Sequence, residues 1–193
     1  ERFETPANVL SASPVELCGV PGVGLSLSRS LRDPQFREHV GQTLEFCASQ
    51  GVRILIPTCS EFPRLLREIP DPPSVLFLRG QLQPSDSLSV AIVGTRRASQ
   101  YGRFQAARFA RCLSRAGLTI VSGLALGIDA AAHHGAMEAE GRTIAVLSSG
   151  VTEIFPPQHD DLARSIVDSG ALVSEMPPRS RPKRGMFPRR NRL

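Results

Sequence analysis

The C-terminal half of the chain alternates short apolar runs with longer amphipathic segments. Four runs predict buried β-strands, because each holds consecutive apolar residues without polar alternation: 88–94, 118–123, 143–150 and 171–175. Three segments between them predict helices: 101–116, 128–140 and 158–168. The first of these helices has apolar residues at i, i+3, i+4, i+7 spacing, namely Ala106, Phe109, Ala110 and Leu113. This alternation predicts an α/β fold with a doubly wound parallel, extended Rossmann-like sheet.

The first fifty residues predict a small helical domain. Ser13, Pro14 and Glu16 have the order of an N-cap, a first-turn proline and a capping-box acid. The turn VPGVG at 20–24 separates this helix from a second one, an arrangement that resembles a helix-hairpin-helix unit whose amides can meet a DNA phosphate. An ordinary glycine turn between packed helices is the slightly favoured alternative, because the hairpin itself holds no lysine or arginine. A third helix is predicted at 34–49.

A connecting segment follows at 51–87. Its sequence predicts a strand at 52–57, a short helix, a proline-rich turn and a strand at 75–78. The polar run QLQPSDS at 81–87 predicts a boundary. The predicted domains are therefore a helical domain at 1–50, the connecting segment at 51–87, and a Rossmann-like domain at 88–193.

Composition excludes several classes of protein. No apolar run approaches the roughly 20 residues of a membrane span, and the first residues lack the pattern of a secretory signal. The four cysteines, at positions 18, 47, 59 and 112, form no C-x-x-C pair, which argues against a zinc site or a disulfide framework. We therefore expect a cytoplasmic protein without a metal or another cofactor.

The positive charge is concentrated in the last fifteen residues. Arginine and lysine occur seven times between Arg179 and Leu193, without an acid, whereas the whole chain carries only +5. Phe187 lies within this segment. Cations for phosphates and a ring for a base are the components of single-strand nucleic-acid binding. A disordered basic tail is the alternative interpretation of the segment alone.

Two loops at predicted strand ends carry further candidate residues. Gly94, Thr95 and Arg96 follow the first strand, where the glycine permits a sharp turn and the arginine can reach an anion. The string is not G-x-G-x-x-G and no acid ends the second strand, so a nicotinamide cofactor is not expected.

The second strand ends in the sequence SGLALGID, at 122–129. Glycines 123 and 127 allow close approach of a backbone, and the amides of the next helix open toward the same crevice. Ser122, Asp129 and His133 suggest a hydrolytic triad, but the G-x-S-x-G elbow is missing. We expect Asp129 to stabilise the helix start and His133 to be a structural hydrogen-bond partner.

Five motifs occur in an order that resembles the DNA-processing protein A (DprA/Smf) family. They are SVAIVGTRRASQYG, IVSGLALGIDAAAH, GRTIAVLSSGVTEIFPPQH, LVSEMPP and FPRRNR. The preceding FPRLLREIPDPPSVLFLRG also resembles that family, and the N-terminal helices are similar to its sterile-alpha-motif-like domain. The resemblance covers residues 61–193, and the first sixty more loosely.

This resemblance implies a protein of natural transformation that is not an enzyme. It would bind and protect incoming single-stranded DNA and help to load the recombinase RecA. The resemblance places Arg96, Lys183 and Arg184 against DNA and Phe187 against a base, with Gly123, Gly127 and Asp129 lining the pocket. The predicted DNA-binding set is completed by Gly94, Thr95, Ser122 and Arg190.

The family continues beyond F-P-x-R-N-R with further strands and helices. This continuation predicts that the present chain is a fragment or a truncated product, with a C-terminally incomplete sheet and an exposed apolar edge. The family's contacts for a homodimer and for RecA lie largely in that further part.

An alternative function is a nucleoside monophosphate phosphoribohydrolase of the lysine-decarboxylase-like (LOG) group. That group shares the glycine loops at strand ends but needs a P-G-G-x-G-T-x-x-E signature, which does not occur in these 193 residues.

Overall fold

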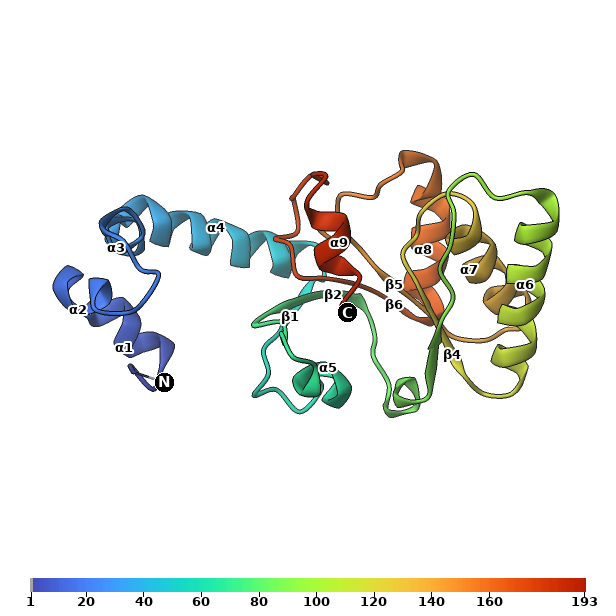
Figure 1. Cartoon of the computed structure of the whole chain (residues 1–193), viewed down its shortest axis with the longest axis horizontal. Helices are drawn as coiled ribbons and strands as arrows, with labels where there is room; N and C mark the ends of the chain where they lie inside the picture. The colour runs from blue at the N-terminus through green and yellow to red at the C-terminus, as the bar shows by residue number, and fades with distance from the viewer. Residues whose placement is uncertain (1) are drawn as a thin grey trace. The chain divides into compact units, whose positions relative to one another are not determined.

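The computed structural model describes residues 2–193, which form two compact units (Figure 1). The first unit ends at Phe46 and the second runs from Cys47 to Leu193. The predicted domain limits at residues 50 and 87 stay predictions. Within residues 2–193, no helix is both long and apolar enough to cross a membrane.

The first unit is helical. It contains α1 (Pro6–Ser11), α2 (Pro14–Cys18), α3 (Leu25–Arg32) and most of α4 (Pro34–Ser49). The capping box predicted for α2 is present: the Glu16 amide donates to the Ser13 hydroxyl, and the Ser13 amide donates to the Glu16 carboxylate. Such reciprocal caps satisfy backbone amides at the start of a helix, which explains why α2 begins directly after Ser13.

The second unit is built on one six-stranded sheet. Its strands are β1 (Arg53–Leu55), β2 (Leu76–Gly80), β3 (Ser89–Ala91), β4 (Thr119–Ser122), β5 (Thr143–Val146) and β6 (Ala171–Ser174). Their order is β1-β2-β6-β5-β4-β3. The four strands from β3 to β6 are parallel, as the sequence predicts. The α/β fold with a Rossmann-like sheet is thereby confirmed.

The two strands predicted in the connecting segment belong to the same sheet, which is therefore mixed and not entirely parallel. β2 pairs antiparallel with β6, with Phe77 opposite Ser174, and β1 pairs antiparallel with β2. The connecting segment thus folds back and covers the apolar edge of β6. The outer strands of the sheet are consequently β1 and β3, each of three residues.

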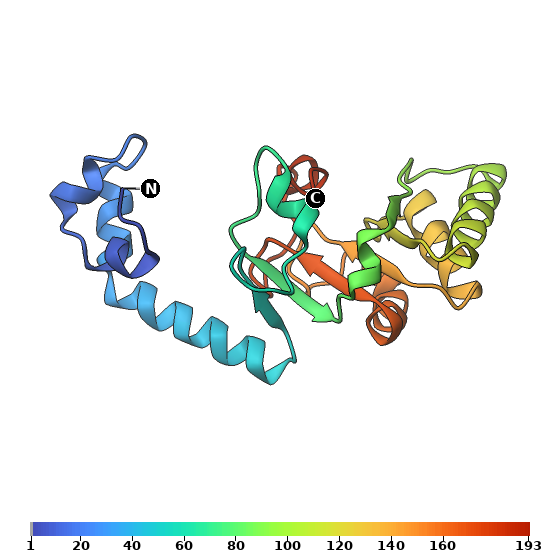
Figure 2. The same cartoon turned by 90° about the horizontal axis from the view of Figure 1, so that it is seen from below.

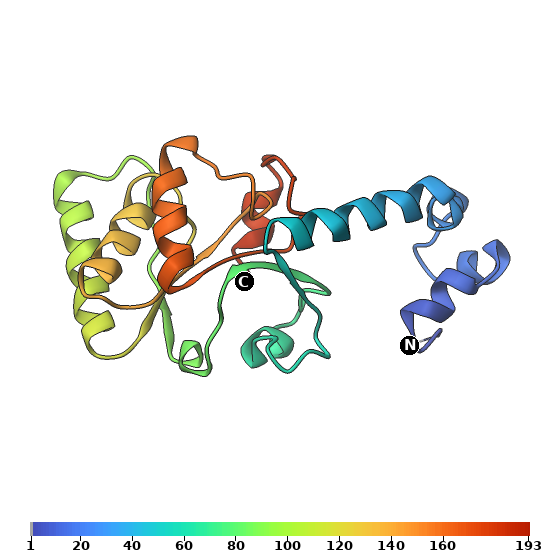
Figure 3. The same cartoon turned by 180° about the vertical axis from the view of Figure 1, so that it is seen from behind.

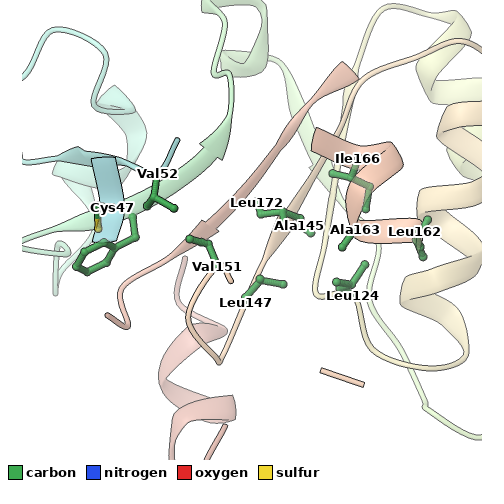
Figure 4. Packing of buried hydrophobic residues seen from close by; sticks show 11 residues of the cluster. Cys47, Val52, Leu124, Ala145, Leu147, Val151, Leu162, Ala163, Ile166 and Leu172 are labelled. Carbon is green, nitrogen blue, oxygen red and sulfur yellow. The ribbon is translucent and has the colours of Figure 1, made fainter. Parts of the chain in front are cut away.

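Both faces of the sheet are buried at its centre, but the prediction that the first parallel strand is buried was wrong, because Ser89 and Ala91 of the outer strand β3 are exposed. In β6, Leu172 belongs to one apolar cluster, whereas its neighbours Ala171 and Val173 belong to another. Because alternate residues of a strand point to opposite faces, the two clusters lie on opposite sides of the sheet. Figure 4 shows the first cluster, in which Leu162 and Ile166 of α8 pack toward Leu172.

Three longer helices follow the parallel strands. They are α6 (Gln100–Arg115), α7 (Ile128–Glu138) and α8 (Asp160–Ser169). α7 lies between α6 and α8 (Figures 1 and 3), and α6 lies at one end of this unit, as Figure 2 also shows. The shorter elements are α5 (Arg64–Glu68), the 3-10 helices η1 (Pro84–Ser87) and η2 (Pro157–His159), and α9 (Met186–Arg190).

One residue of the predicted α6 core is on the surface. Phe109 is 62% exposed, whereas Ala106 and Ala110 are buried. The helix buries a face of small residues because α7 approaches closely: a Cβ on Gly135 would lie only 2.2 Å from the Ala107 carbonyl oxygen. A phenyl ring has no room in that contact and projects from the flank instead.

A buried ion pair anchors the segment between β2 and β3. Arg142 donates from Nε and Nη2 to the two carboxylate oxygens of Asp86, each at 2.9 Å, and the Thr119 hydroxyl donates to the same carboxylate. Burial alone would raise the pKa of Asp86. The bonds from Arg142, the Gln83 amide and Thr119 outweigh burial, so this pKa lies below its usual value.

Candidate nucleic-acid interface

The loops after β3 and β4 interlock at the carboxyl ends of these strands. Gly127, directly before α7, has φ +84°, and a Cβ there would lie 2.3 Å from the Thr95 carbonyl oxygen. The Ile128 amide donates to that oxygen at 3.3 Å, and a Cβ on Gly94 would meet the Ile128 side chain at 2.7 Å. The two glycines are therefore required for close packing, and together they fix the backbone that carries Arg96.

Two polar side chains hold the loop after β4. The Ser122 hydroxyl donates to the Ile92 carbonyl oxygen at 2.6 Å, and the Ala125 amide lies 3.4 Å from Asp129 Oδ2. Both residues are buried. Asp129 therefore pins the start of α7, as predicted from the sequence.

The hydrolytic triad does not assemble. His133 Nδ1 lies 2.7 Å from the Thr143 hydroxyl oxygen, and that hydroxyl donates to the Ile120 carbonyl oxygen at 2.8 Å. The hydroxyl must then accept from Nδ1–H, which leaves Nε2 without a proton. Since the Ser122 hydroxyl is engaged with the Ile92 carbonyl oxygen, neither group is arranged for nucleophilic catalysis.

The loops after β5 and β6 are joined by hydrogen bonds. The Gly150 amide donates to the Ser180 carbonyl oxygen at 2.8 Å, and the Thr152 hydroxyl donates to the Pro178 carbonyl oxygen at 2.6 Å. Ser174 adds a bond from its hydroxyl to the Ser149 carbonyl oxygen at 2.7 Å. The start of the basic segment is thus a fixed loop beside the sheet, and the interpretation as a disordered tail was wrong.

Helix α9 places one aromatic ring at the centre of this site. The Phe187 ring is half-buried, and its centroid lies 6.4 Å from that of Phe155 in an edge-to-face arrangement. On the Phe187 ring lies the Arg96 guanidinium, whose Cζ is 4.7 Å from the centroid. The structure therefore joins the β3 loop and α9, two segments about ninety residues apart in sequence, through a cation–π contact.

Arg190 fastens α9 to the sheet. Its Nη1 donates to the Val146 carbonyl oxygen at 2.6 Å, and its guanidinium lies so close to Gly123 that a Cβ there would be 1.8 Å from Nη1. Burial lowers the pKa of Arg190, the negative charge of Asp129 opposes this effect, and the positive charge of Arg96 adds to it. The glycine of the β4 loop thus provides the space that this arginine occupies.

Arg192 ties the end of the chain to two acidic residues. Its Nη2 donates to the Glu175 carboxylate, and its Nη1 donates to the Asp71 carbonyl oxygen at 2.5 Å. Nε lies 3.0 Å from Asp71 Oδ2 but lacks the alignment of a hydrogen bond. The Glu175 side chain is only 10% exposed, so this contact holds a largely buried carboxylate.

The remaining cations of the predicted set face solvent. Arg96, Lys183 and Arg184 are exposed, and among residues 2–193 none of the three side chains forms an ion pair. Within the same residues, no group of three histidine, cysteine or acidic side chains could hold a metal ion. The site therefore combines three features that suit an anionic ligand: cations without ion-pair partners among these residues, one ring available for stacking, and a backbone ordered by glycines.

The structure brings Arg96 onto Phe187, Arg190 beside Gly123 and Gly127 against Thr95, and it adds residues that the sequence did not indicate. Phe155 orients the Phe187 ring, and Glu175 with Asp71 receives Arg192. Phe155 lies within the motif IFPP after β5, next to the predicted crevice. Its position after the end of a strand was the one sequence signal that could have indicated Phe155 as a site residue.

The matches to known proteins all point to one family. A model described as DNA recombination-mediator protein A matches residues 53–193. The Smf protein of Synechocystis sp. is 39% identical over 197 residues, covering 100% of this chain and 50% of that protein. The DNA processing protein DprA of Bacillus subtilis is 36% identical over 160 residues, covering 82% of this chain and 54% of that protein. The chain spans about half the length of these relatives.

Two solved structures share the fold. The X-ray structure of DNA processing protein A from Streptococcus pneumoniae superposes with a TM-score of 0.80 at 29% identity, covering 94% of this chain and 62% of that one. DNA processing protein A from Helicobacter pylori, described for its single-stranded DNA binding mode, superposes with a TM-score of 0.64 at 31% identity. That match covers 72% of this chain and 62% of the other.

Proposed function

Since this chain belongs to the DNA recombination-mediator protein A family, we propose that it binds single-stranded DNA at the carboxyl ends of strands β3 to β6. The observation that carries this proposal is the ring of Phe187, held at the centre of the site with Arg96 on its face. Gly94, Thr95, Gly123 and Gly127 line the proposed site, the buried Ser122 and Asp129 hold its loops, and Arg190 secures α9 to the sheet.

The cations bind the phosphates. Arg96 lies on the Phe187 ring, and the exposed Lys183 and Arg184 precede Phe187 by four and three residues, so successive phosphates of one strand can each meet a positive charge. Each neutralised phosphate releases condensed counterions, which makes the affinity fall as salt rises. No sequence preference is expected from such contacts, because phosphates carry no base information.

The Phe187 ring stacks with one base. In the free protein the Arg96 guanidinium occupies one face of that ring, and Phe155 meets it edge to face. A base that takes the place of the guanidinium keeps the stacking energy, and the released Arg96 turns to a phosphate. Arg96 thus covers this face of the ring until DNA binds.

The test is fluorescence anisotropy on labelled oligo-dT at several salt concentrations. Arg184→Ala and Lys183→Ala are each expected to weaken binding and to reduce the salt slope by about 0.7. Arg64→Ala on α5, where the side chain is 86% exposed, is the control and should change neither quantity. If the two site variants bind as tightly as the parent chain with the same slope, the proposed site is wrong.

The finer role proposed is protection of incoming DNA in natural transformation and loading of RecA, without an enzymatic step. The family is generally a non-enzymatic recombination mediator. RecA loading is tested by adding the chain to RecA and coated single-stranded DNA and following filament growth. A homodimer is tested by sedimentation. Release of a free base from a nucleoside monophosphate would instead support the phosphoribohydrolase alternative.

A further inference from the structure

The outward face of α6 combines aromatic rings with unpaired arginines. Tyr101 is 72% exposed and Phe104 is 61% exposed, although rings of this size normally bury most of their surface. Arg108 and Arg115 are exposed on the same helix. The spacing of these four residues, at i, i+3, i+7 and i+14, places them on one side of a helix with 3.6 residues per turn.

The charge of this face is unbalanced. The sixteen residues of α6 include four arginines and no acid. Arg111 forms an ion pair with Glu138, and Arg103 donates to the Ala98 carbonyl oxygen. For Arg108 and Arg115, by contrast, no side-chain partner exists within residues 2–193. A protein partner with the same face would be repelled, whereas a polyanion would be attracted.

The face begins where the proposed DNA site ends. The loop from Gly94 to Ser99 carries Arg96, which contacts Phe187, and then Arg97, which is exposed. Ser99 caps α6, and Tyr101 lies in its first turn. At roughly 1.5 Å per residue, the sixteen residues of α6 extend this surface by about 24 Å.

We propose that single-stranded DNA leaving the Phe187 site continues along α6, with bases on Tyr101 and Phe104 and phosphates on Arg97, Arg108 and Arg115. We call these five residues the α6 track. Rings for bases together with cations for phosphates are the means by which proteins bind a single strand without sequence preference. This inference rests on the proposed function of the Phe187 site, because that site anchors the strand.

The experiment compares two oligo-dT lengths, of about five and about twenty nucleotides, chosen around the usual site sizes of single-strand modules. The double variant Arg108→Ala/Arg115→Ala should bind the long oligonucleotide more weakly and lower its salt slope by about 1.4, since each lost phosphate contact removes about 0.7. The short oligonucleotide should bind as before. The double variant Arg64→Ala/Arg164→Ala, which removes two exposed arginines from α5 and α8, is the control of equal charge and should bind both lengths like the parent chain.

The aromatic part has its own variants. Tyr101→Ala should weaken binding of the long oligonucleotide about five- to 150-fold, which corresponds to the loss of one stacked base. Tyr101→Phe should restore it, because the ring is kept. Because Tyr101 is exposed, its replacement by alanine should not disturb the fold. An unchanged thermal unfolding midpoint of Tyr101→Ala would exclude misfolding as the cause of weaker binding.

The outcomes separate the two proposals. If Arg96→Ala weakens binding of both oligonucleotides while the α6 double variant changes the affinity for neither, the Phe187 site is supported and the α6 track is wrong. If Arg96→Ala changes the affinity for neither oligonucleotide, the proposed function itself is wrong. If the α6 variants leave DNA binding intact but abolish self-association in sedimentation, the face binds a second copy and the inference is overturned.

Discussion

The Arg96 guanidinium lies on the face of the Phe187 ring, 4.7 Å from Cζ to the centroid. Arg96 belongs to the loop after β3 and Phe187 to α9, so this contact exists only in the folded chain. The guanidinium occupies the face of the ring on which we propose that a base stacks. The contact also explains why α9 points its ring toward the strand ends.

Replacement of Phe187 should separate stacking from charge. Phe187→Ala is expected to lower affinity for oligo-dT about five- to 150-fold, because one stacked base is lost. The salt slope should stay the same, since no phosphate contact is removed. Anisotropy titrations across salt measure both quantities. Phe187→Trp is the matched control and should keep most of the affinity; an equal loss in both variants would contradict a stacking role.

Gly127→Ala should damage the site, whereas Gly117→Ala should affect only stability. Both glycines have a positive φ, +84° and +86°, and the strain of an L residue there costs about 1–3 kcal/mol. A Cβ at Gly127 also lies 2.3 Å from the Thr95 carbonyl oxygen, whereas nothing lies within 4 Å of one at Gly117. Gly127→Ala must therefore displace the loop of Arg96 and weaken DNA binding.

Denaturant unfolding and oligo-dT titration of both variants test this. The expected pattern is a shared loss of stability and a loss of affinity confined to Gly127→Ala. Normal DNA binding by Gly127→Ala would show that the Arg96 loop does not need the close approach of Gly127.

The buried His133 should make stability fall in mild acid. Burial, together with the positive charges of His134, His159 and Arg190, lowers the pKa of His133 to about 3. In the unfolded chain the pKa is about 6.5, so below that pH the unfolded state binds a proton that the native state does not. The free energy of unfolding should then fall as pH decreases from about 6.5 toward 3, by at most about 1.4 kcal/mol per pH unit from this residue.

Unfolding curves at several pH values measure this slope. His133→Gln should lose its share of the slope, even if its stability at neutral pH differs. His134→Gln is the matched control, because that neighbouring side chain is exposed. A parent chain and a His133→Gln variant with the same slope would argue against a neutral buried His133.

Arg192→Ala should weaken DNA binding without removing a DNA contact. The variant leaves Glu175 largely buried and without its cation, and the lost charged hydrogen bonds correspond to about 1.5–3 kcal/mol. Because Arg192 also reaches the Asp71 carbonyl oxygen, its loss releases the end of the chain next to α9. Phe187 would then lose its fixed position.

The readouts are unfolding free energy and affinity for oligo-dT. In Arg192→Met/Glu175→Leu the unpaired carboxylate is gone, so most of the stability should return. If Arg192→Ala lowers stability but leaves the affinity and its salt slope unchanged, the position of α9 does not depend on the contacts of Arg192 with Glu175 and Asp71.

The sequence by itself determined the parallel core of the fold and the strand-end position of the candidate site. Continuous apolar runs between amphipathic helices specify buried parallel strands, because this spacing is local and repeats along the chain. The glycines at 94, 123 and 127 were also identifiable, since each lies at the end of a predicted strand or in the loop to the next helix, where a turn is needed. The resemblance in motif order named the family that the matches then showed.

Only the tertiary structure decided which distant groups meet. Three contacts join segments that no local pattern connects: β2 with β6, Arg96 with Phe187, and Arg192 with Glu175. The exposure of Phe109 likewise depends on the helix that packs against α6. Hydrophobic periodicity gives the face of a helix but not the size of the residue opposite it, and charge counts do not say which arginines are neutralised. Those outcomes depend on packing and on the pairing of buried charges, which arise when residues 47–193 fold around one sheet.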